Sequence, residues 1–274
     1  IYRGNASATY TGIYTAGINV TESNFTNIRN VTFNVSGTAN TGTHYGVSLN
    51  NNTINTTIYN NTFYMGGASI AANLNTSNHA IYALFRVRNS TIANNTILYQ
   101  NVTGSNNSAI RLEYEVYNNT IRNNTIRTNS TSGNNNHGIH LSLNASENTI
   151  DGNSIITNST VNNTGIMLES NSHNNTIFNN SIIANGTGLG NHGVFITNVA
   201  RGNIIRGNTI QTNGTNDNYG IDFTSGGGPV TNNTIANNTI RTFGTSSSNI
   251  GFMSGATEFA NNLIENNTIY TYGV

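Results

Sequence analysis

Hydrophobic and polar positions alternate along this chain in short runs, and one six-residue pattern recurs nine times. The pattern is Ile-x-Asn-Asn-Thr-Ile or a near variant of it. Successive copies start 30, 34, 29, 29, 27, 28, 30 and 29 residues apart, at Ile28, Ile58, Ile92, Ile121, Ile150, Ile177, Ile205, Ile235 and Ile264. Such a period is typical of solenoids, in which each unit contacts only its neighbours and equivalent residues stack.

The apolar runs within each repeat favour strands over helices. They are short and have a period of two, as in the Gly-Ile-x-Leu segments at 138–141 and 165–168. The abundant Asn, Ser and Gly disfavour helix interiors, whereas Ile, Val, Thr, Tyr and Phe favour strands. Each repeat has room for three short strands, one at Gly-Ile-x-Leu and one at each Asn-Thr-Ile segment. We therefore predict an all-β solenoid of about nine coils that forms a single domain over residues 1–274.

The two asparagines of the pattern have different roles. The first position exchanges Asn with Gly, which indicates a left-handed turn with positive φ. The second position is never Gly, so its side-chain amide is required, and we predict an inward asparagine ladder. The ladder residues are Asn30, Asn61, Asn95, Asn124, Asn153, Asn180, Asn208, Asn238 and Asn267. A second column is expected at Asn119, Asn148, Asn175, Asn203, Asn233 and Asn262, with Thr26, Thr56 and Ser90 in the earlier coils.

These stacked Asn-Asn-Thr-Ile phrases resemble right-handed parallel β-helix repeat proteins of the pectate-lyase-like and NosD-like kind. The resemblance covers residues 18–270 and implies a right-handed coil. It does not decide the function, because this architecture serves lyases, hydrolases, adhesins, tailspikes and surface-layer proteins alike. The coils are longer than usual, with extra residues in the loop after Asn-Thr-Ile, as at 128–137, and the largest insertion at 64–79.

Charge is sparse in this sequence. Charged residues make up 7% of the 274 residues, all ten basic residues are Arg, and the formal net charge is zero. Such a chain has no basic field, so we expect no nucleic-acid partner. Cysteine is absent, which excludes disulfides and thiolate metal sites. No apolar run is long enough to span a bilayer. We also expect no cofactor.

The acidic residues are too few and too scattered for the cleavage chemistry that the resemblance implies. Polysaccharide-cleaving relatives need clustered carboxylates, or calcium-binding acids beside a cation, and only ten acids occur here. We therefore expect no enzyme. The alternative is a carbohydrate-active or carbohydrate-binding face of outward residues, namely Arg111, Glu113, His140 and Glu169. The competing interpretation is exposed side chains that form weak ion pairs.

Three histidines occupy equivalent turn positions, but they lie in coils that are not adjacent. His79, His137 and His192 are separated by Ser108 and Thr164, so the imidazoles are expected about 10 Å apart. Metal ligation needs a closer approach, and we predict no metal site. Outward aromatic residues at Tyr59, Tyr82, Phe178 and Phe195 could stack on sugar rings.

Acceptor sequences for N-glycosylation are dense, with about 26 Asn-x-Ser/Thr sequons along the chain. The repeat itself creates many of them. Their register is nevertheless informative, because the acceptor is the turn asparagine and not the inward one. We expect glycans at Asn60, Asn94, Asn118, Asn123, Asn174, Asn179, Asn232, Asn237 and Asn266, with partial occupancy because neighbouring coils crowd one another.

The preferred function from sequence is structural. We expect an extracellular or cell-surface, N-glycosylated building block of a filament, sheath, surface layer or adhesin stalk. Because the chain opens on Ile1 and shows no capping helix, we expect either a fragment of a longer chain or coils that stack end to end with further copies. Neighbouring surface proteins are the other expected partners.

Overall fold

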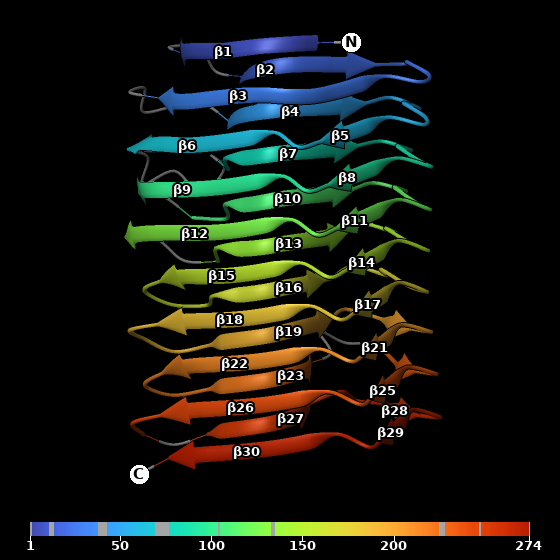
Figure 1. Cartoon of the computed structure of the whole chain (residues 1–274). Coiled ribbons are helices and arrows are strands. Elements are labelled where there is room, and N and C mark those ends of the chain that lie inside the picture. The colour runs from blue at the N-terminus through green and yellow to red at the C-terminus, as the bar shows by residue number, and fades with distance from the viewer. Residues whose placement is uncertain are drawn as a thin grey trace.

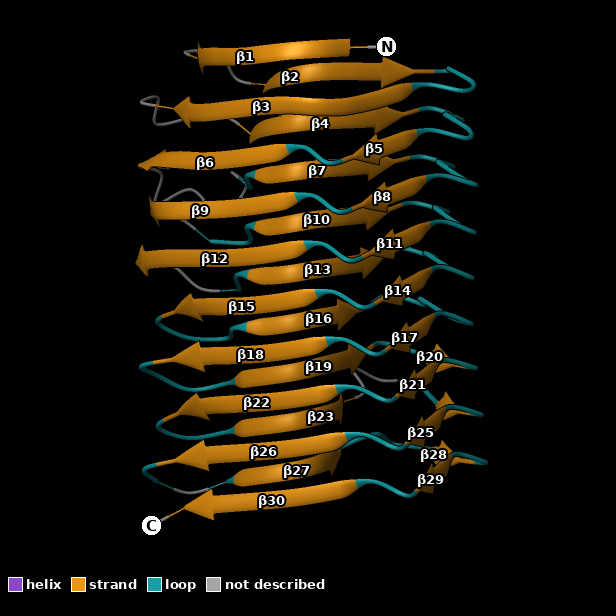
Figure 2. Ribbon diagram, viewed as in Figure 1, coloured by secondary structure: helices purple, strands orange, loops and turns teal. Residues whose placement is uncertain are grey.

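A computed structural model describes residues 2–10, 14–37, 43–68, 77–103, 105–132, 135–224, 228–246 and 248–273. Within these ranges the chain winds as a parallel β-solenoid, with its turns stacked from the N-terminus at one end to the C-terminus at the other (Figure 1). Figure 2 shows strands joined by loops, without helices, in this part of the chain. The predicted all-β repeat fold is confirmed.

The strands form columns, and each turn contributes one strand to each column. The Gly-Ile-x-Leu segments form a nine-stranded sheet. Its members are β2 (Tyr14–Thr21), β4 (Thr43–Asn50), β7 (His79–Leu84), β10 (Ser108–Glu113), β13 (His137–Ser142), β16 (Thr164–Leu168), β19 (Asn191–Thr197), β23 (Asn218–Thr224) and β27 (Asn249–Ser254). The nine predicted coils correspond to these nine strands.

The two Asn-Thr-Ile segments form the remaining two predicted columns, on either side of the Asn pair. The short strands before the pair are β5 (Thr57–Tyr59), β8 (Thr91–Ala93), β11 (Thr120–Arg122), β14 (Thr149–Asp151), β17 (Thr176–Phe178), β21 (Ile204–Arg206), β25 (Thr234–Ala236) and β29 (Leu263–Glu265). The long column contains β1 (Tyr2–Tyr10), β3 (Asn27–Gly37), β6 (Thr62–Ala68), β9 (Thr96–Thr103), β12 (Thr125–Ser132), β15 (Ser154–Ser159), β18 (Ser181–Gly186), β22 (Thr209–Gly214), β26 (Thr239–Gly244) and β30 (Thr268–Gly273).

A fourth column, which the sequence did not indicate, follows the nine-stranded sheet. It begins as single bridges that connect residues 24, 54, 88, 117, 146 and 173. It continues as β20 (Ala200–Arg201), β24 (Val230–Thr231) and β28 (Phe259–Ala260). Within the predicted insertion at 64–79, residues 69–76 lie outside the described part of the chain.

The core consists of aliphatic side chains stacked in register. Ile121 pairs with Ile150, and Ile150 pairs with Ile177, and all three are fully buried. Burying each such side chain contributes about 1.5–3 kcal/mol before the entropy cost of ordering is subtracted. The glycine of Gly-Ile-x-Leu is required by this packing, because a Cβ at Gly165 would collide with the side chain of Ile182. Glycine at this position thus allows the nine-stranded sheet to pack closely against the long column.

The predicted asparagine ladder is present from Asn61 to Asn267. Each step has two bonds, in which the backbone N–H and the Nδ2 of one asparagine both donate to the Oδ1 of the next. Nδ2 also donates backward to a backbone carbonyl, as Asn153 does to Ile121 at 2.9 Å. The steps run Asn61, Asn95, Asn124, Asn153, Asn180, Asn208, Asn238 and Asn267. Buried turn backbone is satisfied in this way at every step.

Asn30 was assigned to this ladder wrongly. It is exposed, has a φ of 56°, and accepts from Asn60 Nδ2 at 2.7 Å, so it belongs to the outward turn column. Val31 takes the inward place, where its N–H donates to Asn61 Oδ1 at 3.0 Å. The inward position lies directly before the strand residue that follows the turn, as Asn61 does before Thr62. Thr32 pairs with Thr62, so the inward position of this first step is Val31, which fills it with a buried apolar side chain.

The second predicted column also forms a buried ladder. Asn119 donates to Asn148 Oδ1 through both its backbone N–H and its Nδ2, and the same pairing continues to Asn175, Asn203, Asn233 and Asn262. A third set of stacked asparagines, not predicted, precedes the nine-stranded sheet. Asn107 donates to Asn136, and Asn163 donates to Asn191, which donates to Asn218. Amide ladders therefore hold several corners of each turn.

Candidate functional site

The predicted carbohydrate face lies on the outer side of the nine-stranded sheet. Register brings its residues together, because Arg111 on β10 pairs with His140 on β13, and His140 pairs with Met167 on β16. Glu169 follows β16 directly, and Glu113 ends β10. Because successive side chains of a strand point to opposite faces, Ile139 and Leu141 lie in the core and His140 lies on the outer side.

Arg111 and Glu113 form an ion pair that is mostly shielded from solvent. Arg111 Nε lies 3.1 Å from Glu113 Oε2, and the two side chains are 17% and 12% exposed. Tyr82, on the neighbouring strand β7, donates its hydroxyl to Glu113 Oε2 at 2.6 Å. Burial, and then the contact with Glu113, raises the pKa of Tyr82, so its hydroxyl stays protonated and donating. Glu113 is thus held by two neighbours.

His140 and Glu169 form the second polar contact of this face. His140 Nε2 lies 3.0 Å from Glu169 Oε1. The ring of His137 packs edge-on against that of His140, with centroids 5.0 Å apart. Both histidines are buried, and the Nδ1 atom of each has no hydrogen-bond partner among the described residues.

Burial controls the charge of these groups. It lowers the pKa of His140, with the Glu169 contact opposing the shift, and it lowers the pKa of His137 well below its usual range, helped by His140 and Arg111. Both imidazoles are therefore neutral near pH 7. For Glu169, burial raises the pKa, but His140 and Arg111 together outweigh it, so the pKa is lowered overall and the carboxylate stays ionised.

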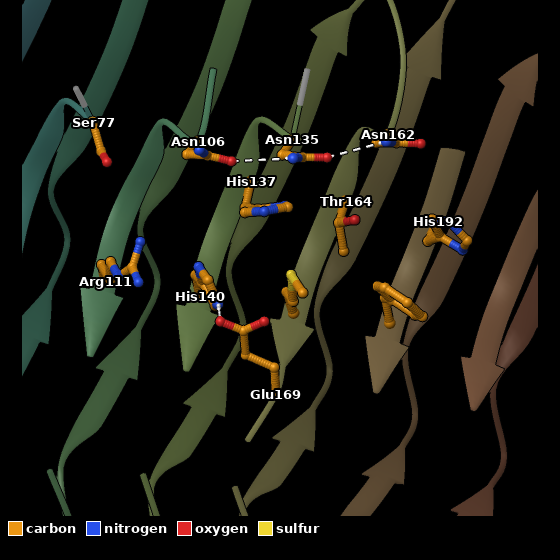
Figure 3. Close-up of a pocket in the computed structure, with 12 residues that line it drawn as sticks. Ser77, Asn106, Arg111, Asn135, His137, His140, Asn162, Thr164, Glu169 and His192 are labelled. Atoms are coloured by element: carbon orange, nitrogen blue, oxygen red, sulfur yellow. Dashed lines mark hydrogen bonds and ion pairs between the residues drawn. The ribbon is translucent and has the colours of Figure 1, made fainter. Parts of the chain in front are cut away.

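A groove of about 880 Å³ runs across β10, β13, β16 and β19 over this face. Arg111, His140 and Glu169 lie on its floor, and His137 lies nearer its edge (Figure 3). The remaining lining side chains are Ser77, Thr164, Met167, His192 and Phe195. Along one rim runs a row of amides in which Asn162 donates to Asn135, and Asn135 donates to Asn106, each at 3.1 Å.

Of the four residues predicted for this face, three line the groove and Glu113 supports it through Arg111. The sequence reasoning treated His137 only as a possible metal ligand and did not group it with His140. The edge-on packing of their rings depends on side-chain conformation, which the sequence pattern does not reveal. Tyr82 was expected on the outer side, and it is there, but it is 9% exposed because it stacks on Tyr45.

The other predicted positions are distributed as follows. Ser108 separates His79 from His137, and Thr164 separates His137 from His192, as the register predicted. Within the described residues, no three His, Cys, Asp or Glu side chains are grouped closely enough to hold a metal ion. Phe195 stacks on His192 in the groove, whereas Tyr59 and Phe178 lie on the short-strand column, away from it.

The nine predicted glycan acceptors share one geometry. All are exposed, and all have φ between 52° and 58°, which places them at left-handed corners of the turns. They are Asn60, Asn94, Asn118, Asn123, Asn174, Asn179, Asn232, Asn237 and Asn266. In the same column Gly152 and Gly207 have φ of 62° and 66°, so the exchange of Asn with Gly does mark positive φ.

Residues 8–240 match the family described as the right-handed β-helix region. The chain belongs to this family. The resemblance noted from its repeats is therefore confirmed, and the solenoid is a right-handed β-helix. No curated protein is similar enough to match the sequence. In the described part of the β-helix, no helix is long and apolar enough to cross a membrane.

Solved structures with a similar fold include carbohydrate-active enzymes. A double mutant of the periplasmic alginate epimerase AlgG has 12% identity over 97% of this chain and 77% of its own, with a TM-score of 0.49. The A-module of a mannuronan C-5 epimerase from Azotobacter vinelandii has 16% identity over 98% and 80%, with a TM-score of 0.45. The catalytic domain of a GH87 α-1,3-glucanase has 15% identity over 98% and 64%, with a TM-score of 0.37. At this similarity the matches concern the fold alone.

Proposed function

We propose that this β-helix binds a neutral glycan chain in the groove over β10, β13, β16 and β19. The observation that carries the proposal is the buried polar floor of the groove, where Arg111, His140 and Glu169 converge below a rim of amides. Pockets that orient small ligands combine a few well-placed polar groups with apolar surface, and here Met167 and Phe195 supply the apolar part.

The rim favours a ligand that repeats. Asn106, Asn135 and Asn162 are equivalent residues of successive turns, so their amides recur with the spacing of parallel strands, about 4.8 Å. That spacing is comparable to the length of one sugar unit in an extended chain. A polysaccharide lying across the strands would therefore meet the same donor and acceptor groups at each unit.

The charge of the groove favours a neutral polymer over an acidic one. Arg111 is already neutralised by Glu113, and Glu169 contacts His140, which burial keeps uncharged. The carboxylates of a polyuronate would thus meet the ionised carboxylate of Glu169, and the groove has no unpaired positive charge to neutralise them. Repulsion between like charges in a partly desolvated groove disfavours such a ligand.

The protonation of the floor supports binding rather than hydrolysis. A general acid for glycoside cleavage needs a raised pKa, and the pKa of Glu169 is lowered instead. His140 could act as a base only through a nitrogen that reaches the ligand, and both of its ring nitrogens are buried beneath neighbouring side chains. The proposed function is therefore a non-catalytic carbohydrate-binding face.

Affinity electrophoresis and calorimetry with soluble glucans, mannans and xylans, and a polyuronate for comparison, would test the proposal. The variants Arg111→Ala and Glu169→Gln should each weaken binding of a neutral polymer about tenfold, since a hydrogen bond to a charged group is worth about 1.5–3 kcal/mol. Arg122→Ala removes an exposed arginine from the short-strand column and is the matched control.

Three outcomes would contradict the proposal. They are unchanged binding in both groove variants, preferential binding of the polyuronate, and release of reducing ends from any of the polymers. The last would show that the groove is catalytic.

We also propose an extracellular location with N-linked glycans on the turn columns. The support is the shared geometry of the nine acceptors, each exposed at a left-handed corner while the neighbouring ladder asparagine is buried. Mass spectrometry of the protein from its natural source would decide this, since an intact mass equal to the 29.3 kDa of the bare chain excludes glycans on this segment. A structural role with end-to-end assembly stays a prediction from sequence.

A further inference from the structure

A second hollow lies at the opposite end of the strands that form the groove. It has a volume of about 410 Å³ and lies over the turns that follow β4, β7, β10 and β13. Its apolar part is a pair of stacked rings, Phe85 and Tyr114, with centroids 4.8 Å apart. These side chains remain 46% and 41% exposed. We refer to Phe85, Arg86, Tyr114 and Glu115 as the aromatic ledge.

The backbone under the aromatic ledge is strained. Phe85 and Arg86 have φ of 59° and 60°, and Tyr114 and Glu115 have φ of 63° and 57°. Two consecutive left-handed residues shape this turn in other coils too, but there at least one of the two is Asn, which tolerates the conformation, as at 51–52, 143–144 and 170–171. Neither residue is Asn in the two pairs of the ledge. A bulky aromatic residue at such a position is an outlier, and outliers of this kind concentrate at functional sites.

Burial does not account for the choice of aromatic residues, since both rings keep over two-fifths of their surface in solvent. The turn itself does not need them either. Asn52 makes the same kind of backbone bond to the next turn as Arg86 does, from N–H to carbonyl oxygen, at 2.9 Å and 3.0 Å. What the rings add is an exposed flat surface beside a hollow.

The polar surroundings of the rings fit a sugar. Arg86 Nε lies 2.6 Å from Glu115 Oε2, and both side chains are more than half exposed. The amides of Asn51, Asn52 and Asn144 line the rest of the hollow, together with Glu22 and Leu143. Sugar rings place their C–H face against an aromatic ring and their hydroxyls against planar amides and charged groups, which is the combination present here.

We propose that the aromatic ledge binds one sugar unit of the glycan chain held in the groove, an inference that takes its ligand class from the function proposed above. The two sites adjoin the same strand, β10. Arg111 lines the groove, and Tyr114, three residues further along the chain, belongs to the ledge. A glycan chain that crosses β19, β16 and β13 and then bends along β10 would reach both.

The variants Phe85→Asn and Tyr114→Asn separate a binding role from a structural one. Asn suits the left-handed conformation, so each variant should unfold at the same or a higher temperature than the wild type. Binding should nevertheless weaken about fivefold, the loss that corresponds to one aromatic stacking contact of about 1 kcal/mol. The probes are a trisaccharide and an octasaccharide of each neutral polymer that is tested on the groove. Only the octasaccharide is long enough to reach both sites, so the weakening is expected for the octasaccharide.

Ser170→Asn is the matched control, because Ser170 has a φ of 52° at the equivalent turn position beyond the hollow. It should leave the binding of both probes unchanged. If the two ledge variants unfold earlier and bind the octasaccharide like the wild type, the ring stack is a packing feature and the proposal is wrong.

The groove variants Arg111→Ala and Glu169→Gln make failure of the two proposals distinguishable. If they bind normally while the ledge variants do not, the groove proposal falls and the ledge remains a binding site. If the groove variants lose binding and the ledge variants keep it, the ledge proposal alone falls.

Discussion

Asn153 donates to Asn180 Oδ1 twice, from its backbone N–H and from its Nδ2, each at 2.9 Å. It also accepts two bonds on its own Oδ1 from Asn124, at 3.0 Å and 2.9 Å. One buried side chain therefore satisfies backbone and amide groups in three successive turns. This connection explains why glycine never replaces the second asparagine of the pattern from Asn61 onward.

The first prediction concerns that ladder. Asn153→Ala would leave the N–H and Nδ2 of Asn124 and the carbonyl of Ile121 without their partner inside the core. Each buried group left unsatisfied costs about 1–3 kcal/mol, so the free energy of unfolding should fall by about 3 kcal/mol or more. Urea unfolding followed by circular dichroism measures this loss. Asn129→Ala, on an exposed position of β12, should change it by less than about 0.5 kcal/mol.

The second prediction concerns the glycine of Gly-Ile-x-Leu. Gly165→Ala would place a methyl group against the Ile182 side chain and 2.7 Å from the carbonyl oxygen of Gly193. Because the neighbour on one side is backbone, the clash cannot be relieved by a rotamer change alone, and overpacking should cost about 1–3 kcal/mol. Ile182→Ala removes the Cγ2 methyl that makes the clash, so the double variant should lose less stability than the sum of the two single variants, which chemical denaturation of the three proteins would show. A fully additive pair would contradict this account.

The third prediction is a loss of stability at mildly acidic pH. Burial holds the pKa of His137 and His140 below the ordinary value of about 6.5 that applies in the unfolded chain. Below that pH the unfolded state binds more protons than the folded state, so stability is complete above about pH 6.5 and declines as the pH falls further. Thermal unfolding between pH 7.5 and pH 5 should show this slope, and His137→Gln should reduce it. Equal slopes in both proteins would contradict the prediction.

The fourth prediction ranks the glycan acceptors. Asn179 occupies a column in which the previous and next turns carry Gly152 and Gly207, so no neighbouring acceptor crowds it. Asn94 is followed in the same column by Asn123, about one strand spacing away. If the protein is N-glycosylated, occupancy at Asn179 should exceed that at Asn94. Peptide mass spectrometry of the glycosylated protein measures both, and equal or reversed occupancy would contradict the crowding argument.

The fold could be predicted in detail because its determinants are local and repeated. The repeat position at which Asn and Gly exchange identified the left-handed corners. The next position, which is never Gly, identified the buried ladder. Asn30 is the one misplaced ladder residue. Its copy of the pattern contains a single asparagine, and only the pairing of Thr32 with Thr62 shows that this asparagine occupies the outward position. The third amide column was not singled out, although its residues lie directly before one paired position of the nine-stranded sheet, as Asn107 does before Ser108 and Asn136 before His137. The residues that follow them vary in type, so no repeated phrase marks the column.

The candidate site was predicted only in outline. Register alone brought Arg111, His140 and Glu169 to one face, but the burial of His140 and the edge-on contact with His137 depend on side-chain packing between turns. The aromatic ledge could not be predicted at all. Phe85 and Tyr114 are residue types that give no sign of a left-handed backbone, so the sequence shows them as ordinary strand residues.

The amide rows run in opposite directions on the inside and the outside of the rod. Each buried ladder asparagine turns its Oδ1 toward the preceding turn, as Asn180 does toward Asn153, whereas in the outer row at the groove rim Asn135 turns its Oδ1 toward the following turn, to Asn162. Backbone bonds between turns also point both ways, forward from Phe85 to Glu113 and backward from Arg88 to Thr53. Opposed rows of dipoles largely cancel, so the ladders should tie the turns together without making the two ends of the rod electrically different.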